Sequence, residues 1–308
     1  MKKESFLPYL AGIGAAVIFG FSFLFTKEAL QVTRPIYFLA YRFTVAFIFI
    51  SLLAIVRLIR IRLGKILFKE LLPLILVQPL LYFTMEAMGV QRTTSSVAGL
   101  MISTIPVFVL ILAHIFLGER LKILQVVSIF VALSGVILIT LSRGGEFGAE
   151  FLGIIFLFAS TFSAALYNIL SRQASLKAKP IEITYVMMFA GFVGFNVIAF
   201  MQSLALNELN NFLTSFIHPQ IVISALYLGT LSSTVAFFLI NYTLSKLPAS
   251  KASVFPYLST VVTLFAGILI RGEKFAITGL FGAILILIGV YGVNRLSVKH
   301  APKRRLKR

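Results

Sequence analysis

Two stretches of the sequence, 154 residues apart, decide how the chain is organised. Residues 95–136 read SSVAGLMISTIPVFVLILAHIFLGERLKILQVVSIFVALSGV, and residues 249–290 read ASKASVFPYLSTVVTLFAGILIRGEKFAITGLFGAILILIGV. They align without a gap. Apolar matches alone mean little in so apolar a sequence, but the turns Gly118-Glu119-Arg120 and Gly272-Glu273-Lys274 fall at the same point of both stretches. We interpret this pattern as an internal repeat.

The composition excludes most classes of protein. Of 308 residues, 59% are hydrophobic and 12% are charged, and the mean hydropathy is +1.00. Soluble domains carry about 25% charged residues, so a soluble enzyme, a disordered chain and a fibrous protein are excluded. The chain has no Cys and no Asp, and His114, His218 and His300 are far apart, so we expect no metal site and no cofactor.

Long apolar runs indicate membrane-spanning helices, each of which needs about 20 residues. We predict an all-α polytopic membrane protein with ten transmembrane helices. The expected spans are Phe6–Thr26, Ile36–Val56, Leu71–Val90, Ser95–Leu117, Ile123–Leu141, Phe151–Ser171, Ile183–Gln202, Val222–Leu244, Ala249–Ile270 and Ala276–Val293.

The repeat is five spans long, and an odd number forces its two copies to insert in opposite senses. We therefore predict a first five-helix repeat over residues 1–145, a second, inverted repeat over 146–295, and a basic cytoplasmic tail over 296–308. Inverted repeats are typical of secondary transporters that alternate access around a site near the membrane midplane.

The distribution of basic residues predicts the orientation. With the N-terminus inside and alternating spans, 21 Lys and Arg residues fall in cytoplasmic segments and 6 in external ones. Both termini are therefore expected in the cytoplasm, and the protein in the cytoplasmic membrane. The first apolar run ends at Thr26-Lys27-Glu28 without a cleavage site of small residues, so we interpret it as a span rather than a signal peptide. The net charge of +18 lies between apolar runs, which argues against binding to nucleic acid.

Several short motifs together resemble the EamA-type branch of the drug/metabolite transporter superfamily, from about Tyr9 to Val293. Their order and spacing are the specific part of the resemblance. In place of a Trp that the family often has, this chain has Phe19 and Phe162. The motifs are Phe19-Gly20-Phe21-Ser22, Lys27, Pro35, Arg42, the two Gly-Glu-basic turns, Asn241-Tyr242-Thr243-Leu244 and Pro248-Ala249-Ser250-Lys251-Ala252-Ser253.

The resemblance implies ten helices in two inverted repeats around a central cavity lined by helices 1, 3, 4, 6, 8 and 9. Family members move amino acids, their derivatives, nucleosides, sugars or toxic compounds, often outward. No motif assigns the substrate.

Two ionisable residues lie inside the expected spans, where a charge is costly and therefore points to function. Arg42 lies about 9 Å inside helix 2 and Glu86 about 6 Å inside helix 3, at the rise of 1.5 Å per residue, so their depths match. They could form a structural ion pair, or Glu86 could bind a substrate amine or a proton while Arg42 sets its pKa. Arg42 could also extend to the outer headgroups.

Polar uncharged residues on the helices that the resemblance assigns to the cavity are candidates for substrate binding, because amides and hydroxyls can orient a small molecule. The alternative for each is a hydrogen bond between helices. The candidates are Gln78, Tyr82, Ser103, Tyr167, Asn168, Tyr227, Asn241 and Tyr257.

Four further residues are candidates for gating. Pro106 and Pro256 lie inside the first helix of each matched pair, where proline breaks or kinks a helix. His114 near the inner end of helix 4 could respond to pH. Lys27 ends helix 1 and recurs in the family. The alternatives are packing for the prolines and an interfacial anchor for His114 and Lys27.

The pattern favours a secondary transporter that moves a small metabolite, an amino acid or related compound, by alternating access and with export as the favoured direction. An efflux carrier for lipophilic or cationic drugs is the alternative; an embedded enzyme or a channel lacks the required residues. No phosphate-binding glycine loop suggests coupling to ATP. The expected partners are a small-molecule substrate and the lipid bilayer, with no nucleic acid; the oligomeric state is open, and a monomer could function.

Overall fold

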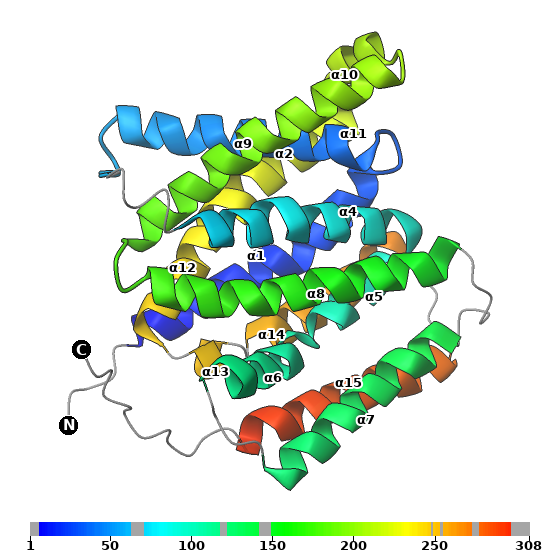
Figure 1. Cartoon of the computed structure of the whole chain (residues 1–308). Helices are drawn as coiled ribbons and strands as arrows, with labels where there is room; N and C mark the ends of the chain where they lie inside the picture. The colour runs from blue at the N-terminus through cyan, green and yellow to red at the C-terminus, as the bar shows by residue number, and fades with distance from the viewer. Residues whose placement is uncertain are drawn as a thin grey trace.

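The computed structural model describes residues 6–62, 71–117, 122–141, 149–247, 249–252, 255–272 and 277–296. These residues form helices joined by short connections, and no strand occurs among them (Figure 1). The first half contains α1 (Leu7–Ala29), α2 (Pro35–Ile55), the π-helical segment η1 (Leu76–Tyr82), α4 (Phe83–Arg92), α5 (Ser95–Ile102), α6 (Ile105–Leu117) and α7 (Ile123–Leu141). The second half contains α8 (Ala149–Ala174), α9 (Pro180–Ala205), α10 (Leu209–Ser215), α11 (Pro219–Leu226), the π-helical segment η2 (Tyr227–Ala236), α12 (Phe237–Lys246), α13 (Ala249–Ala252), α14 (Phe255–Arg271) and α15 (Ile277–Leu296).

The helices have the length and polarity of a multi-pass membrane protein. Within the described residues, seven helical stretches are long and apolar enough to cross a membrane: Leu7–Ala29, Pro35–Ile55, Leu71–Arg92, Ser95–Leu112, Ala149–Ala174, Pro180–Ala205 and Pro219–Lys246. Three shorter apolar helices, Ile123–Leu138, Phe255–Arg271 and Gly279–Gly289, lie where the fifth, ninth and tenth spans are expected. Large apolar side chains such as Ile48, Leu52 and Phe265 are exposed on the outside, which suits contact with lipid.

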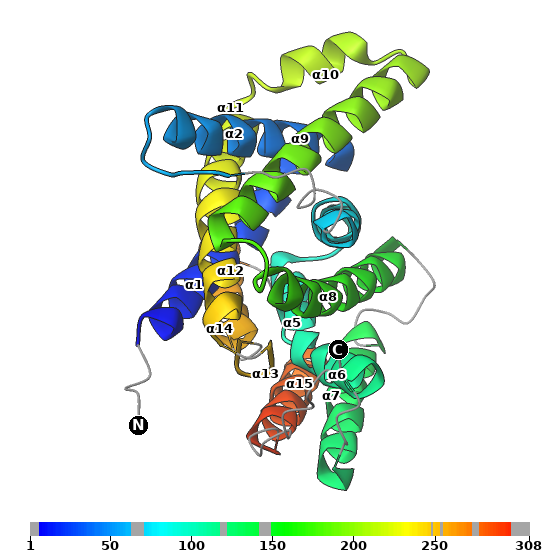
Figure 2. The ribbon, with the colours of Figure 1, turned by 60° about the vertical axis from the view of Figure 1, so that its left-hand side comes forward.

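The first helix of each half packs mainly against the other half. α1 packs chiefly against α14, η2 and α12, whereas α8 packs against α4, η1 and α6. α1 and α8 run in opposite directions, so their C-terminal ends lie on opposite sides of the molecule (Figures 1 and 2). The start of α1 and the end of α15 lie on the same side, at the left of Figure 1.

The third expected span of each half, which is the third and the eighth span of the chain, contains a π-helical segment that the sequence does not predict. When η1 is shifted by 154 residues, it falls on residues 230–236, within η2. Pro79 lies inside η1, and a proline in a helix interior removes one backbone hydrogen bond. π-Helical turns are rare and frequently lie at functional sites, so the two segments direct attention to the space between them.

The fourth and ninth spans are interrupted rather than continuous. Ser103 and Thr104 form a turn between α5 and α6, and Pro106 is the second residue of α6. Pro256 is likewise the second residue of α14, which follows the short helix α13. The expected turn 118–120 lies outside the described residues, as do residues 273 and 274; Gly272 has a φ of +63°, which favours glycine.

The connection after α9 holds a short helix, α10, that the sequence analysis did not foresee. Phe212 of α10 stacks on Tyr41, with ring centroids 5.5 Å apart. Arg34 donates hydrogen bonds of 2.7 and 2.6 Å to the two carboxylate oxygens of Glu208, and these bonds lower the pKa of that carboxyl. Both contacts attach α10 to the beginning of α2.

α7 and α15 pack closely through small residues, in a reciprocal pattern. A Cβ added to Gly135 would lie 2.5 Å from the carbonyl oxygen of Gly282, and one added to Gly289 would lie 2.6 Å from that of Ser128. Gly135 and Gly289 are 154 residues apart, and so are Ser128 and Gly282. Each contact therefore becomes the other when the roles of the two helices are exchanged. A two-fold relation between helices produces such a pair of contacts.

This packing predicts that Gly135→Ala and Gly289→Ala each lower the free energy of unfolding by about 1–3 kcal/mol, because the backbones must separate to admit a methyl group. Gly14→Ala is the matched control, since its Cβ would meet only Leu239 Cδ1 at 3.4 Å. Chemical unfolding of the purified proteins in detergent measures all three. Equal stability of the Gly135 and Gly14 variants would contradict the packing described here.

Candidate substrate-binding cavity

A cavity lies at the centre of the helices, between the two π-helical segments. It contains about 750 Å³ of empty space, part of which is open to the outside. Its walls come from α1, η1 and α4, α5 and α6, α8, η2 and α12, and α13 and α14, with Arg42 added from α2. The first six of these groups are the spans that the resemblance assigns to a cavity.

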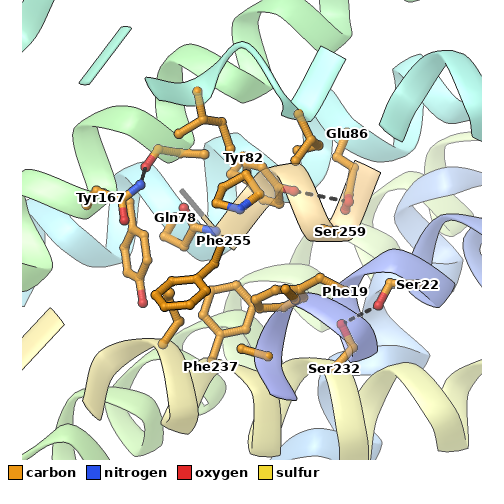
Figure 3. Close-up of a pocket in the computed structure, with 18 of the residues that line it drawn as sticks. Phe19, Ser22, Gln78, Tyr82, Glu86, Tyr167, Ser232, Phe237, Phe255 and Ser259 are labelled. Carbon is orange, nitrogen blue, oxygen red and sulfur yellow. Dashed lines mark hydrogen bonds between the residues drawn. The ribbon is translucent and has the colours of Figure 1, made fainter. Parts of the chain in front are cut away.

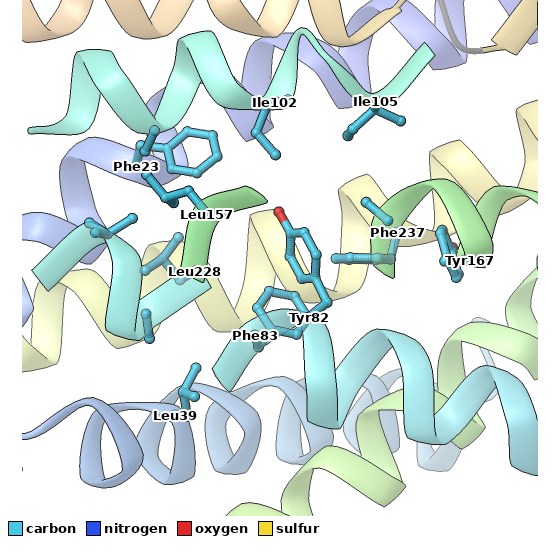
Figure 4. Packing of buried hydrophobic residues seen from close by; sticks show 14 of the residues in the cluster. Phe23, Leu39, Tyr82, Phe83, Ile102, Ile105, Leu157, Tyr167, Leu228 and Phe237 are labelled. Atoms are coloured by element: carbon cyan, nitrogen blue, oxygen red, sulfur yellow. The ribbon is translucent and has the colours of Figure 1, made fainter. Parts of the chain in front are cut away.

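One wall of the cavity is aromatic. Phe19, Phe237 and Phe255 gather on one side of it in Figure 3. The rings of Phe19 and Phe237 meet edge to face at 5.2 Å, and Tyr167 approaches Phe237 at 5.9 Å. Figure 4 shows Tyr82 between Phe83 and the pair Ile102 and Ile105, all of which also line the cavity. Such a surface suits an apolar part of a ligand.

The opposite side carries a buried ion pair. Arg42 and Glu86 are 1% and 4% exposed, and Arg42 Nη1 lies 3.8 Å from Glu86 Oε2. Arg42 Cζ lies 4.3 Å from the centroid of the Phe83 ring, a cation–π contact. Tyr82 donates a hydrogen bond of 3.2 Å to the other carboxylate oxygen, Glu86 Oε1. The pair is therefore held by α2, η1 and α4 together.

Hydrogen bonds connect this pair to the second π-helical segment. Arg42 Nε donates to Ser233 Oγ at 2.8 Å, and Nη2 donates to Ser232 Oγ at 3.1 Å. Ser22 of α1 contacts Ser232 Oγ at 2.9 Å, as Figure 3 shows. One polar network therefore joins α1, α2, η2, α4 and η1 at the cavity.

Four buried polar atoms that line the cavity make no hydrogen bond to any described residue. They are Arg42 Nη1, Gln78 Oε1, Glu86 Oε2 and Ser259 Oγ. Arg42 Nη1 and Glu86 Oε2 form the ion pair at 3.8 Å but lack hydrogen bonds, and a buried polar atom without a hydrogen bond costs about 1–3 kcal/mol. Together the four atoms offer a cationic donor, an anionic acceptor, an amide oxygen and a hydroxyl to a molecule in the cavity.

The lining residues form pairs separated by 154 positions, one from each half of the chain. Phe83 pairs with Phe237, and Gln78 pairs with Ser232. The remaining pairs are Glu86 with Ile240, Ile102 with Pro256, and Ile105 with Ser259. The two halves thus supply equivalent positions to one cavity, with the same side chain in the pair Phe83 and Phe237 and different side chains in the other four pairs.

Seven of the residues singled out in the sequence line the cavity: Arg42, Gln78, Tyr82, Glu86, Tyr167, Asn168 and Pro256. Seven others lie elsewhere: Lys27, Ser103, Pro106, His114, Tyr227, Asn241 and Tyr257. Whether a candidate lines the cavity depends on the direction in which its side chain points from the helix. The residue type and its depth in the membrane do not determine that direction.

Asn241 is a buried junction between three helices. Its Oδ1 accepts hydrogen bonds from Tyr167 and Ser171, both at 2.7 Å, and its Nδ2 donates to Thr184 Oγ1 at 3.0 Å. Asn241 is 0% exposed, so α12, α8 and α9 share its amide. Asn241 therefore makes hydrogen bonds between helices, which is the alternative to substrate binding given for the polar candidates.

The other residues outside the cavity also have local contacts. Ser103 donates to the carbonyl of Leu100 at the break between α5 and α6. Tyr227 begins η2, stacks on Phe25 and donates to the carbonyl of Ile18 on α1. Tyr257 is partly buried against the core, and His114 is exposed in the last turn of α6. Lys27 bonds to the end of α4.

Ser22, Phe237 and Phe255 line the cavity but are not among the residues that the sequence indicates for binding. Pro79 was an available signal for the irregular third span, because a proline in a helix interior breaks the helix. The phenylalanines had no comparable signal, since the chain contains 31 of them.

Comparison with known proteins identifies the family. The EamA-like transporter family matches residues 6–141 and again residues 151–295. The chain belongs to this family. The resemblance seen in the sequence motifs is thereby confirmed, and the protein is a multi-pass membrane protein of a transporter family.

Three relatives are named as transporters or as an exporter, and two of these names give no substrate. The "Uncharacterized transporter YcxC" of Bacillus subtilis is 36% identical over 305 residues, which cover 99% of this chain and 97% of that protein. An "Uncharacterized transporter" of Archaeoglobus fulgidus is 32% identical over 70% of this chain and 73% of its own. A "Probable terminal-alkyne amino-acid exporter" of Streptantibioticus cattleyicolor is 26% identical over 68% of this chain and 67% of its own.

A solved crystal structure has the same fold. It superposes with a TM-score of 0.61 at 16% sequence identity, over 94% of this chain and 96% of the other. At this identity the likeness concerns the fold alone.

The contacts of Asn241 predict that Asn241→Leu lowers the free energy of unfolding by about 2–4 kcal/mol, because the hydroxyls of Tyr167 and Ser171 lose their acceptor inside the bundle. Thermal unfolding in detergent measures the effect. Asn168→Leu is the matched control, because its amide donates only to the carbonyl of Ala164 on its own helix. A smaller loss for Asn241→Leu than for Asn168→Leu would contradict the role as a junction.

Proposed function

We propose that the protein is a secondary transporter that moves a small metabolite, an amino acid or related compound, outward across the cytoplasmic membrane. Membership of the EamA-like transporter family gives the general class. The observation that carries the substrate proposal is the cavity, which combines an aromatic wall with the buried Arg42–Glu86 pair. The similarity to one amino-acid exporter agrees with it.

The binding mode that we propose uses both charges. The carboxylate of a zwitterion binds Arg42 Nη1, and its ammonium group binds Glu86 Oε2; these are the two ionic atoms left without a hydrogen bond. Gln78, Tyr82 and Asn168 contribute further polar contacts, and the side chain of the substrate lies on the aromatic wall. A lipophilic cation could use Glu86 and the aromatic wall alone, so an efflux carrier for such compounds is the second candidate.

The architecture that we propose is ten transmembrane helices in two inverted repeats, residues 1–145 and 146–295, followed by a basic tail over 296–308. Three observations support it. The family matches the chain twice. The contacts of α7 and α15 are reciprocal. The cavity is lined by residue pairs that are 154 positions apart.

Transport by alternating access requires this cavity to open to one side and then to the other. We propose that both termini are cytoplasmic, because Lys and Arg are in excess in the segments that this orientation places in the cytoplasm. A gradient of substrate, protons or another ion supplies the energy. Pro106 and Pro256, at the interrupted helices, act as hinges, and Lys27 and His114 remain candidates for gating.

The proposal is tested by counterflow in proteoliposomes with a panel of labelled amino acids and nucleosides, with and without a pH gradient. We expect saturable exchange of an amino-acid class, because only a carrier accelerates exchange of a labelled substrate for an unlabelled one. Exchange of lipophilic cations, with none of amino acids by the folded protein, would move the assignment to the second candidate. Flux that does not saturate would contradict a carrier of either kind.

For the ion pair we predict that Glu86→Gln lowers counterflow by about tenfold or more while the yield of folded protein stays near normal, because the charge acts on the substrate. Glu208→Gln is the matched control, since this glutamate pairs with Arg34 at the surface. Size-exclusion chromatography and counterflow are measured together. Loss of folded protein in Glu86→Gln, restored by also changing Arg42 to Leu, would instead establish a structural pair.

A further inference from the structure

Two basic side chains make equivalent contacts at opposite ends of the cavity. Lys27, two residues before the end of α1, donates from Nζ to the carbonyls of Val90 at 2.9 Å and Gln91 at 3.0 Å, and also to Thr93. Val90 and Gln91 belong to the last turn of α4. The ammonium group therefore binds backbone carbonyls at the end of a helix other than its own.

Arg172 repeats this arrangement in the second half. It lies two residues before the end of α8 and donates from Nη1 to the carbonyls of Leu244 and Ser245, both at 2.8 Å. These carbonyls belong to the last turn of α12. Leu244 and Ser245 are the positions of Val90 and Gln91 shifted by 154 residues. In the sequence, Arg172 is one of the 21 basic residues of the expected cytoplasmic segments and has no other indication of a role.

The two contacts join helices that pack mainly in different groups, although α1 also contacts α4 and α8 also contacts α12. α1 packs with α14, η2 and α12, and α5 packs on α14; α8 packs with α4, η1 and α6. The cavity lies between these two groups. Lys27 connects α1 to α4, and Arg172 connects α8 to α12, so each contact spans from one group to the other. α1 and α8 end on opposite sides of the molecule (Figure 1), and the lining residues Phe23 and Asn168 lie one turn before Lys27 and Arg172, so one contact lies beyond each end of the lining.

The chemistry of these contacts suits a reversible closure. The last carbonyls of a helix have no partner within the helix and carry the negative end of its dipole, so a cation binds there. Lys27 and Arg172 are both half-buried. When an end of the cavity opens, water reaches the cation and the carbonyls and replaces the broken bonds. The closed state is therefore favoured only modestly, as a transport cycle needs.

We infer that Lys27 and Arg172 are the two gating residues of the cavity: Lys27 holds the end where α1 terminates closed, Arg172 holds the end where α8 terminates closed, and one contact breaks in each half of the transport cycle. In the proposed orientation, Lys27 closes the extracellular end and Arg172 the cytoplasmic end. This inference rests on the proposed function for its role in transport, but the closure itself can be measured without any substrate.

The absence of native cysteine allows a direct test. A single reporter, Ala164→Cys in the wall of the cavity, is labelled with a membrane-impermeant maleimide from one face of oriented membranes at a time. We expect Lys27→Met to raise the labelling rate about five- to thirtyfold from the extracellular face only. Arg172→Met should do the same from the cytoplasmic face only, and Lys27→Arg and Arg172→Lys should stay close to the parent.

Matched controls separate the contacts from a general loss of charge. Arg92→Met removes a basic residue that bonds to Met88 of its own helix, and Lys246→Met removes an exposed one at the end of α12; neither should change labelling. Two results in protein that is folded by size-exclusion chromatography would overturn the inference. The first is labelling that rises equally from both faces in each variant, and the second is labelling that rises from neither face. Sided labelling in a protein that exchanges no substrate would leave the gates standing and reject the proposed function.

Discussion

A guanidinium buried in an apolar bundle must be satisfied by its neighbours, and Arg42 imposes this requirement on the centre of the protein. Ser232 and Ser233 accept two of its hydrogen bonds, the Phe83 ring lies beneath it, and Glu86 balances its charge. Because a buried guanidinium needs such neighbours, these contacts hold α2, η2 and α4 in one arrangement. Arg42 also lines the cavity, and its Nη1 lies 3.8 Å from Glu86 Oε2 and makes no hydrogen bond to a described residue.

Irregular backbone is tolerated inside a membrane only where protein or a cavity surrounds it. The π-helical segments η1 and η2 and the break at Ser103 and Thr104 all lie around this one space. Side chains replace part of the missing regular bonding: Thr234 donates to the carbonyl of Gly229 inside η2, and Ser163 donates to the carbonyl of Val77 in η1. The positions where helices deviate are therefore also the positions that build the binding surface.

The sequence predicts the class of fold and the approach of Arg42 to Glu86, because hydropathy and depth in the membrane follow directly from residue order. It does not predict which way a side chain points around its helix. Asn241 and Tyr167 are both polar and both buried, yet the ring of Tyr167 lines the cavity while the amide of Asn241 joins three helices. The aromatic wall is harder still, because Phe237 and Phe255 differ from lipid-facing phenylalanines only in their neighbours.

An exact two-fold relation would give a cavity that binds a substrate equally well in two orientations. The chain avoids this at positions that are equivalent between its halves: Ile240 stands at the position of Glu86, and Ser232 at that of Gln78. Among the described lining residues, both charges therefore come from the first half, as Arg42 and Glu86. A substrate with one charged end has a single favourable orientation, and the second half offers it an uncharged surface. At the two ends of the cavity the halves remain chemically alike, because Lys27 and Arg172 both bind helix-terminal carbonyls. The repeat is thus maintained where the two sides must open by the same motion and lost where the substrate must be oriented.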